Sequence, residues 1–140
     1  MNVFSRLFDI ALAFLCMFAL PFMLYKAELY DIAFDNAVRN ADLFIARVQH
    51  SECLEDRLVE ELLSGNDSIT GIRFEIELER ESPITGTEEH MAAKVSFREV
   101  SMLLQKYEKI PLGAKDTVKV VIYGRSFGVA TKTLRQGRVR

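Results

Sequence analysis

Hydrophobic and polar positions divide the chain into one long apolar run followed by segments of helical and alternating periodicity. Residues 7–25 (LFDIALAFLCMFALPFMLY) hold one charged residue, Asp9, among nineteen positions. A helix of this length is about 28 Å long, close to the ~30 Å hydrocarbon core of a bilayer. Beyond Lys26 charged residues are frequent, and no second apolar run is long enough to cross. The pattern therefore predicts a single transmembrane helix.

A cleaved signal peptide and a buried helix of a soluble domain are the alternatives to a permanent anchor. Signal sequences usually have apolar cores of about 7–15 residues and small residues at the cleavage site. Here the run is longer and ends in Leu24-Tyr25-Lys26-Ala27, with bulky side chains where small ones are needed. A chain of 140 residues would struggle to surround a buried helix of this kind. An uncleaved anchor is the favoured interpretation.

The run gives the expected domain organisation and orientation. We expect residues 1–26 to form a short tail and the transmembrane helix, and residues 27–140 to form a separate domain. Arg6 and Lys26 flank the span and nearly balance under the positive-inside rule. The short tail and the large domain favour a single-pass protein of the bacterial inner membrane whose C-terminal domain is extracytoplasmic.

Helical periodicity continues past the end of the apolar run. One apolar stripe recurs at spacings of three and four, which is typical of an amphipathic helix. Its members are Tyr30, Ala33, Phe34, Ala37, Ala41, Phe44, Ile45 and Val48. We predict a nearly continuous helix over residues 4–49, kinked near Pro21, which lacks a backbone donor. The stripe packs on the domain's own sheet or, because small residues allow close approach, on other helices; both uses can coexist.

Two shorter helices are expected farther along the chain. Ser51 resembles an N-cap followed by acidic residues, and Gly65 is a natural stop for that helix. Residues 98–112 fit either a short helix or a wide loop. The helix is favoured by Ser96 and Glu99, whose spacing resembles a capping box.

Period-two alternation predicts the strands. Residues 72–79 and 91–97 alternate between apolar and polar side chains and are expected to form an antiparallel pair. Residues 117–123 form a third strand, and a turn at Gly124 leads to a fourth at residues 127–133. The predicted fold class is α+β, with a long N-terminal helix (transmembrane half plus amphipathic half), a second short helix and a three- to four-stranded antiparallel sheet.

Charge is unevenly distributed although the net charge is only −2. Residues 27–89 contain 16 acidic and 5 basic side chains, a net of −11, whereas residues 90–140 contain 3 and 11, a net of +8. The two segments must fold against each other or meet across subunits. Within the sheet, Lys94 is expected on the same face as the glutamates of the first strand. No aromatic-basic interleaving or DNA-binding motif accompanies the basic end, so no nucleic-acid partner is expected.

Potential metal ligands gather once, at His50, Glu52, Cys53 and Asp56. A structural zinc site needs four ligands at recognisable spacing, and the other histidine is His90. A helix start with acidic residues at its positive end explains the same cluster. A Cys53–His50 nucleophile and base would lack an oxyanion hole and an orienting group. We therefore expect no metal and no cofactor here.

Other groups also have plain structural explanations. Glu75, Glu77 and Glu79 share one solvated strand face because of their period of two. Cys16 lies in the apolar run, so it cannot pair with Cys53 within a monomer. Cys53 is either a buried small hydrophobe or a thiol that pairs between subunits. No glycine-rich phosphate loop is present. We expect no catalytic residue, and the protein is not predicted to be an enzyme.

Asp9 is the unusual residue of the apolar run. A carboxylate one turn inside an apolar span costs a few kcal/mol unless it reaches the interface or finds a partner. Two interpretations remain open. Asp9 extends toward the headgroups, or it pairs with another protein's cation or the N-terminal amine of a neighbouring subunit.

The order of these features resembles the TadE-like pseudopilins, minor components of tight-adherence type IV pilus systems. An acidic residue precedes an apolar run with a proline, an alanine-rich helix, a strand pair and a final hydrophobic strand. Two positions depart from the family pattern: the acid is aspartate rather than glutamate, and no glycine precedes the span. The residues that carry the resemblance are Asp9-Ile10-Ala11-Leu12, Pro21, Tyr30, Asn36-Ala37-Val38-Arg39-Asn40-Ala41, Val95-Ser96-Phe97, Leu103-Leu104 and residues 117–123.

The resemblance implies a membrane-anchored structural or assembly subunit of a pilus or secretion apparatus. Its expected partners are the membrane and other pilin-like or secretion-machine subunits, in an oligomer. The alternative is a single-pass, membrane-tethered binding module of an envelope complex that does not polymerise. The residues expected to serve intramembrane pairing and helix packing are Asp9, Pro21, Tyr30, Ala33, Ala37 and Ala41.

Overall fold

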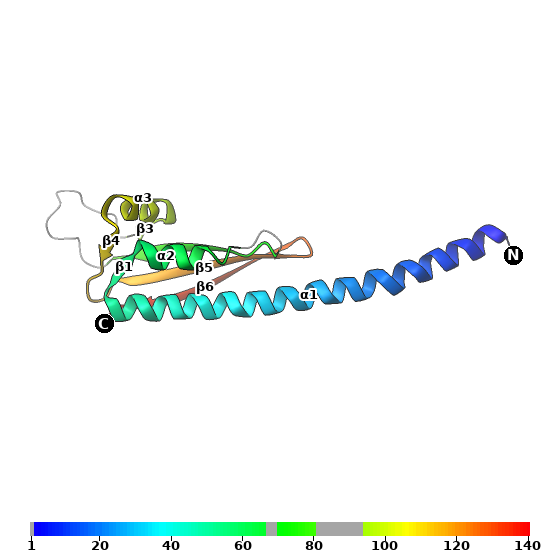
Figure 1. Ribbon diagram of the computed structural model, residues 1–140, viewed down its shortest axis with the longest axis horizontal. Coiled ribbons are helices and arrows are strands. Elements are labelled where there is room, and N and C mark those ends of the chain that lie inside the picture. The colour runs from blue at the N-terminus through cyan, green and yellow to red at the C-terminus, as the bar shows by residue number, and fades with distance from the viewer. Residues whose placement is uncertain (1, 67–69, 81–93) are drawn as a thin grey trace. The chain divides into compact units, whose positions relative to one another are not determined.

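The computed structural model describes residues 2–66, 70–80 and 94–140 (Figure 1). Its elements confirm the α+β fold class. In order they are α1 (Val3–Ser51), β1 (Cys53–Glu55), α2 (Asp56–Leu63), β2 (Arg73–Glu79), β3 (Lys94–Val95), α3 (Phe97–Tyr107), β4 (Lys109–Pro111), β5 (Thr117–Ser126) and β6 (Val129–Arg138). The chain divides into two compact units after Ile32, six residues later than the expected boundary at residue 26. Each unit is described by itself.

The first unit is the N-terminal part of α1. The helix runs without a break from Val3 to Ser51, 49 residues, which confirms the nearly continuous helix predicted over residues 4–49. Pro21 lies inside it. The kink expected there stays a prediction. A single helix satisfies its backbone hydrogen bonds internally, as a segment in hydrocarbon must.

A four-stranded antiparallel sheet of order β3-β2-β5-β6 forms the centre of the second unit. The alternation predicted for β2 and β5 places their apolar side chains opposite one another on one face. Register pairs Phe74 with Ile122, Ile76 with Val120 and Leu78 with Val118. All six side chains are buried. Glu79 lies opposite Lys94, which confirms that Lys94 shares the face of the glutamate row.

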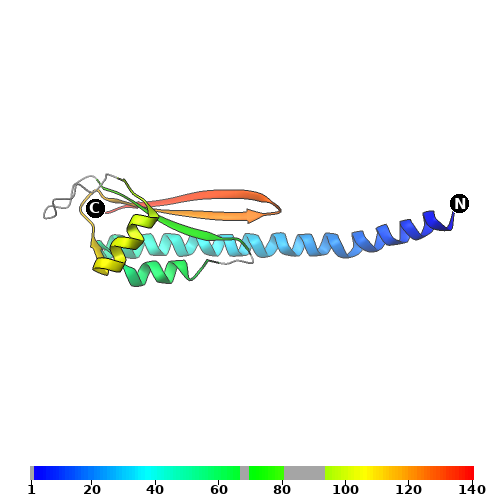
Figure 2. The ribbon, with the colours of Figure 1, turned by 90° about the horizontal axis from the view of Figure 1, so that it is seen from above.

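The domain half of α1 packs on this sheet (Figure 2). Its buried residues are Ala37, Ala41, Phe44, Ile45 and Val48, all members of the predicted stripe. The approach to β6 is close because Gly137 has no side chain: a Cβ there would overlap Ile45 and come within 2.9 Å of the Gln49 amide nitrogen. That amide nitrogen donates to the backbone carbonyl of Arg138 at 2.8 Å.

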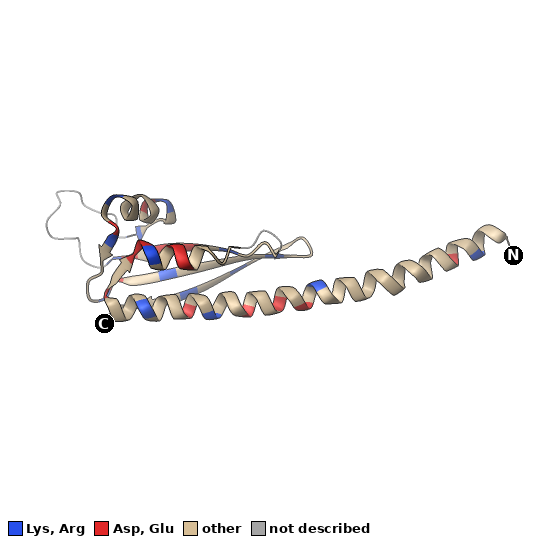
Figure 3. Ribbon diagram, viewed as in Figure 1, with Lys and Arg blue, Asp and Glu red and all other residues tan. Residues whose placement is uncertain are grey.

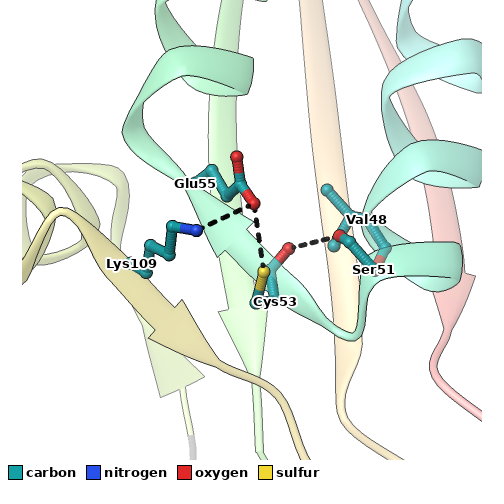
Figure 4. A network of polar contacts seen from close by, with 5 residues as sticks. All are labelled: Val48, Ser51, Cys53, Glu55 and Lys109. Atoms are coloured by element: carbon teal, nitrogen blue, oxygen red, sulfur yellow. Dashed lines mark hydrogen bonds and ion pairs between the residues drawn. The ribbon is translucent and has the colours of Figure 1, made fainter.

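The prediction that Ser51 caps a second helix is wrong. Ser51 ends α1, and its hydroxyl donates to the backbone carbonyls of Val48 (3.4 Å) and Cys53 (3.1 Å) (Figure 4). The hydroxyl is therefore directed at carbonyls rather than at free backbone N–H groups. Glu52 turns the chain at φ 53°, β1 pairs antiparallel with β4, and α2 starts at Asp56.

Two further predictions have different outcomes. The capping box is confirmed, because Ser96 accepts from the backbone N–H of Glu99 and the Glu99 carboxylate accepts from the backbone N–H of Ser96. It starts α3, which excludes the wide loop. The turn predicted at Gly124 is wrong: Gly124 is buried inside β5, and the hairpin turns at Phe127 and Gly128.

The strand predicted for residues 91–97 is only partly described. β3 covers Lys94 and Val95, while Phe97 belongs to α3, because the capping box starts a helix there. Residues 91–93 lie outside the described part of the chain. The fourth strand exists but begins later and ends later than predicted, at Val129 and Arg138.

A buried ion pair joins the ends of three strands. Arg80, just after β2, lies 3.9 Å from the carboxylate of Asp116, just before β5, and donates to the carbonyl of Pro111 in β4 at 2.8 Å. The Asp116 carboxylate also accepts from the backbone N–H of Gly113 at 2.9 Å. Burial lowers the pKa of Arg80, while the charge of Asp116 opposes that shift. The paired charges therefore connect the ends of the central strands β2 and β5 with β4, which belongs to the two-stranded sheet.

Replacing Gly137 with alanine tests the contact between α1 and β6. The added Cβ would overlap Ile45, so we expect a loss of about 1–3 kcal/mol in the free energy of unfolding. Chemical unfolding of the full-length protein in detergent measures it. Gly113→Ala is the matched control, because its Cβ would meet the Asp116 carboxylate at an ordinary 3.7 Å. Equal stability of the two variants would contradict the proposed close packing.

Candidate membrane anchor and assembly surface

The apolar run forms an exposed helical segment. One helix of the described residues is long and apolar enough to span a membrane, and none of its most apolar stretch is buried by the rest of the chain. Figure 3 shows that most of this stretch of α1 is tan, with charged residues only near its two ends. Its large side chains are mostly solvent-facing, for example Phe14 at 61% and Met17 at 74% exposed. Soluble monomers rarely leave so large an apolar surface uncovered.

Length and composition alone also fit a signal sequence near the N-terminus. The structure adds the continuity of α1, in which the apolar segment and the first core element of the domain belong to the same helix. Cleavage after the run would therefore cut within a helix rather than in a loop.

Asp9 and Pro21 both lie on exposed parts of α1. Phe8 and Ile10, on either side of Asp9, are 67% and 59% exposed. Within the described part of the chain, no ion pair is formed by Asp9. On the helix surface its neighbours three and four residues away are Arg6 and Ser5 on one side and Leu12 and Ala13 on the other, so both interpretations of Asp9 remain open.

The other four predicted packing residues divide into two pairs. Tyr30 and Ala33 are half-buried. Ala37 and Ala41 are 4% and 0% exposed, because they belong to the core of the domain. For these two alanines, the structure supports packing on the domain's own sheet. A partner helix has access to other faces of α1.

One such face lies beside α2 and was not singled out from the sequence. Leu43 is 58% exposed there, at a shallow groove whose opposite wall includes Leu58. Arg47 in α1 and Glu61 in α2 form an ion pair of 3.0 Å across it. Leu43 falls outside the predicted stripe, so periodicity gave no signal for it.

The cluster around Cys53 is a polar contact between two short strands (Figure 4). The Cys53 thiol donates to a carboxylate oxygen of Glu55 at 3.6 Å, and the same oxygen lies 3.5 Å from the Lys109 ammonium. His50 belongs to α1 and is no part of this network. Among the described residues, no group of three or more histidine, cysteine or acidic side chains is placed to hold a metal ion.

Acidic and basic segments of the chain meet within the domain. Arg135 donates two hydrogen bonds to the carboxylate of Asp42, at 2.9 and 2.7 Å, and Lys119 pairs with Glu79. The Asp42 carboxylate raises the pKa of Arg135, and the hydrogen bond from Lys119 lowers the pKa of Glu79. The expectation that the two segments fold against each other is confirmed for these pairs.

Comparison with known proteins adds no relative. No family model, curated protein or solved structure matched the chain.

Removing the charge of Asp42 or Arg135 tests the bidentate pair. We expect Asp42→Asn and Arg135→Gln each to lower the unfolding midpoint slightly, and the double variant to be no worse than one single variant. The decrease in the unfolding midpoint should be smaller at high salt, because both side chains are partly exposed and salt screens their charges. A chemical-unfolding double-mutant cycle measures the coupling. Additive effects at low salt would mean that the contact contributes nothing.

Proposed function

We propose that this protein is a membrane-anchored structural or assembly subunit of a pilus or secretion apparatus, similar to a TadE-like pseudopilin. One observation supports the proposal above all: the exposed apolar segment and the first core element of the α+β domain are parts of the same helix. A helix of this kind holds a domain at a membrane and leaves faces of the helix open to neighbouring subunits. In this proposal the domain lies on the extracytoplasmic side of a bacterial inner membrane.

Asp9 supplies the proposed pairing interaction. In hydrocarbon an unpaired carboxylate costs a few kcal/mol, and a cation or terminal amine on a neighbouring subunit would remove much of that cost. The exposed apolar side chains around Asp9 allow another helix to approach. Subunits would therefore associate through the span, while the core alanines Ala37 and Ala41 hold each domain together.

The intact mass and N-terminal sequence of the protein from native membranes test this proposal first. A pilin-like subunit is processed by a prepilin peptidase, so we expect the mature chain to start at or near Ser5, just before the apolar run. An intact Met1 would contradict processing. The protein would then be a permanently anchored binding module that does not polymerise.

Substitution of Asp9 tests the pairing. We expect Asp9→Ala to remain in the membrane fraction but to disappear from cross-linked oligomers and from sheared surface fractions, because the intramembrane partner loses its counter-charge. Asp9→Glu keeps the carboxylate and should restore assembly. Normal assembly of Asp9→Ala would show that this carboxylate has no part in pairing.

A further inference from the structure

The hairpin of β5 and β6 extends beyond the rest of the sheet. β2 pairs with β5 only over residues 117–123, whereas β5 and β6 remain paired up to Ser126 and Val129. Residues 124–131 are here called the distal hairpin; at its base Gly71, which precedes β2, still lies beside Arg125, where an added Cβ would come within 3.4 Å of the Arg125 Cβ. Figures 1 and 2 show its tip projecting past the end of β2.

The tip carries exposed apolar side chains that the fold does not use. Phe127 and Val129 are 60% and 64% exposed. Phe127 and Gly128 occupy the turn at φ 50° and 79°, a geometry in which asparagine and glycine are the usual residues. A phenylalanine there adds backbone strain and contributes nothing to the core. Packing within the domain therefore gives no reason for a phenylalanine at this position.

Basic side chains flank this apolar tip. Arg125 and Lys132 are exposed on the two strands just behind it. From Thr117 to Arg140 the sequence has six basic residues and no acidic one. An apolar tip flanked by basic side chains is complementary to a bilayer surface that contains anionic headgroups.

The tip lies at the end of the domain where α1 enters. Going back along β6, the contacts of Arg138 and Arg135 fall on Gln49 and then Asp42, so β6 traced toward its start follows α1 toward Ala33. From Arg135 to Gly128 a strand extends about 23 Å, whereas from Asp42 to Ala33 a helix covers about 14 Å. The tip therefore projects about 10 Å beyond the level of Ala33.

Only residues 26–32 separate Ala33 from the apolar run, a helical length of about 10 Å. The domain is therefore tethered by a short segment to any bilayer that the run spans. We propose that the distal hairpin is a second membrane contact. Phe127 and Val129 insert into the interface of the leaflet that faces the domain, and Arg125 and Lys132 bind anionic headgroup phosphates. The inference rests on the membrane anchoring in the proposed function, not on pilus assembly.

Tryptophan fluorescence of the full-length protein tests the contact, because the chain contains no tryptophan. Phe127→Trp is reconstituted into vesicles of phosphatidylcholine and phosphatidylglycerol, with or without bromine on the acyl chains. Interfacial side chains lie about 5–10 Å into the boundary between headgroups and acyl chains. We therefore expect the tryptophan at position 127 to emit at shorter wavelength than in water, and its fluorescence intensity to fall roughly twofold when the acyl chains carry bromine. Met102→Trp is the matched control. Met102 is 55% exposed on α3, toward the opposite end of the domain from the tip (Figure 1), and should not be quenched.

A third probe, Phe14→Trp, separates failure of this inference from failure of the anchor. If bromine quenches the tryptophan at position 14 but quenches neither the one at position 127 nor the one at position 102, the membrane anchoring is supported and the hairpin contact is overturned. A blue shift at position 127 without quenching also overturns it, in favour of a protein partner. If position 14 is not quenched, the membrane anchoring itself is wrong.

The headgroup interaction is tested in the same background. Arg125→Gln with Lys132→Gln is expected to reduce the quenching of Phe127→Trp in vesicles that contain phosphatidylglycerol. In vesicles of phosphatidylcholine alone, the variant and its parent should be equal. Undiminished quenching in the anionic vesicles would overturn the proposed role of these two cations.

Discussion

The close contact between Ile45 and Gly137 sets the spacing on which the domain depends. Ile45 occupies the space that a side chain at position 137 would fill, and Gln49 closes the same site with a hydrogen bond to the backbone of Arg138. The small side chains Ala37 and Ala41 are buried on the same part of α1, which fits a close approach of the helix to the sheet. The ion pair of Asp42 and Arg135 then follows from the register along the helix.

Periodicity and local capping predicted most of the fold because they are properties of neighbouring residues. The alternation of β2 and β5, the length of α1 and the capping box at Ser96 are of this kind. The strands β1 and β4 have three residues each, too few to show a period, and they exist only because they pair with each other. Gly124 looked like a turn, but it is a buried position within β5, and the hairpin turns three residues later.

Of the candidate surfaces, only the apolar segment of α1 could be predicted from the sequence. The apolar segment is visible in the sequence because nineteen residues with a single charge are long and apolar enough to span a bilayer. The exposed face around Leu43 and the tip at Phe127 could not be found in the same way. Whether an apolar side chain is buried or exposed depends on which faces the tertiary packing covers, and that information is not local. The exposed apolar side chains Leu43 and Phe127 are therefore features that only the tertiary structure reveals.

β6 is the terminal strand of the four-stranded sheet in the described part of the chain, and it is ten residues long. A strand of this length with an open edge is a template on which a second copy can extend the sheet. Arg135 is paired with Asp42, but Lys132 and Arg138 are exposed cations on this strand, and an identical strand approaching it would carry the same charges. Repulsion between these cations therefore opposes the edge-to-edge pairing of two identical copies.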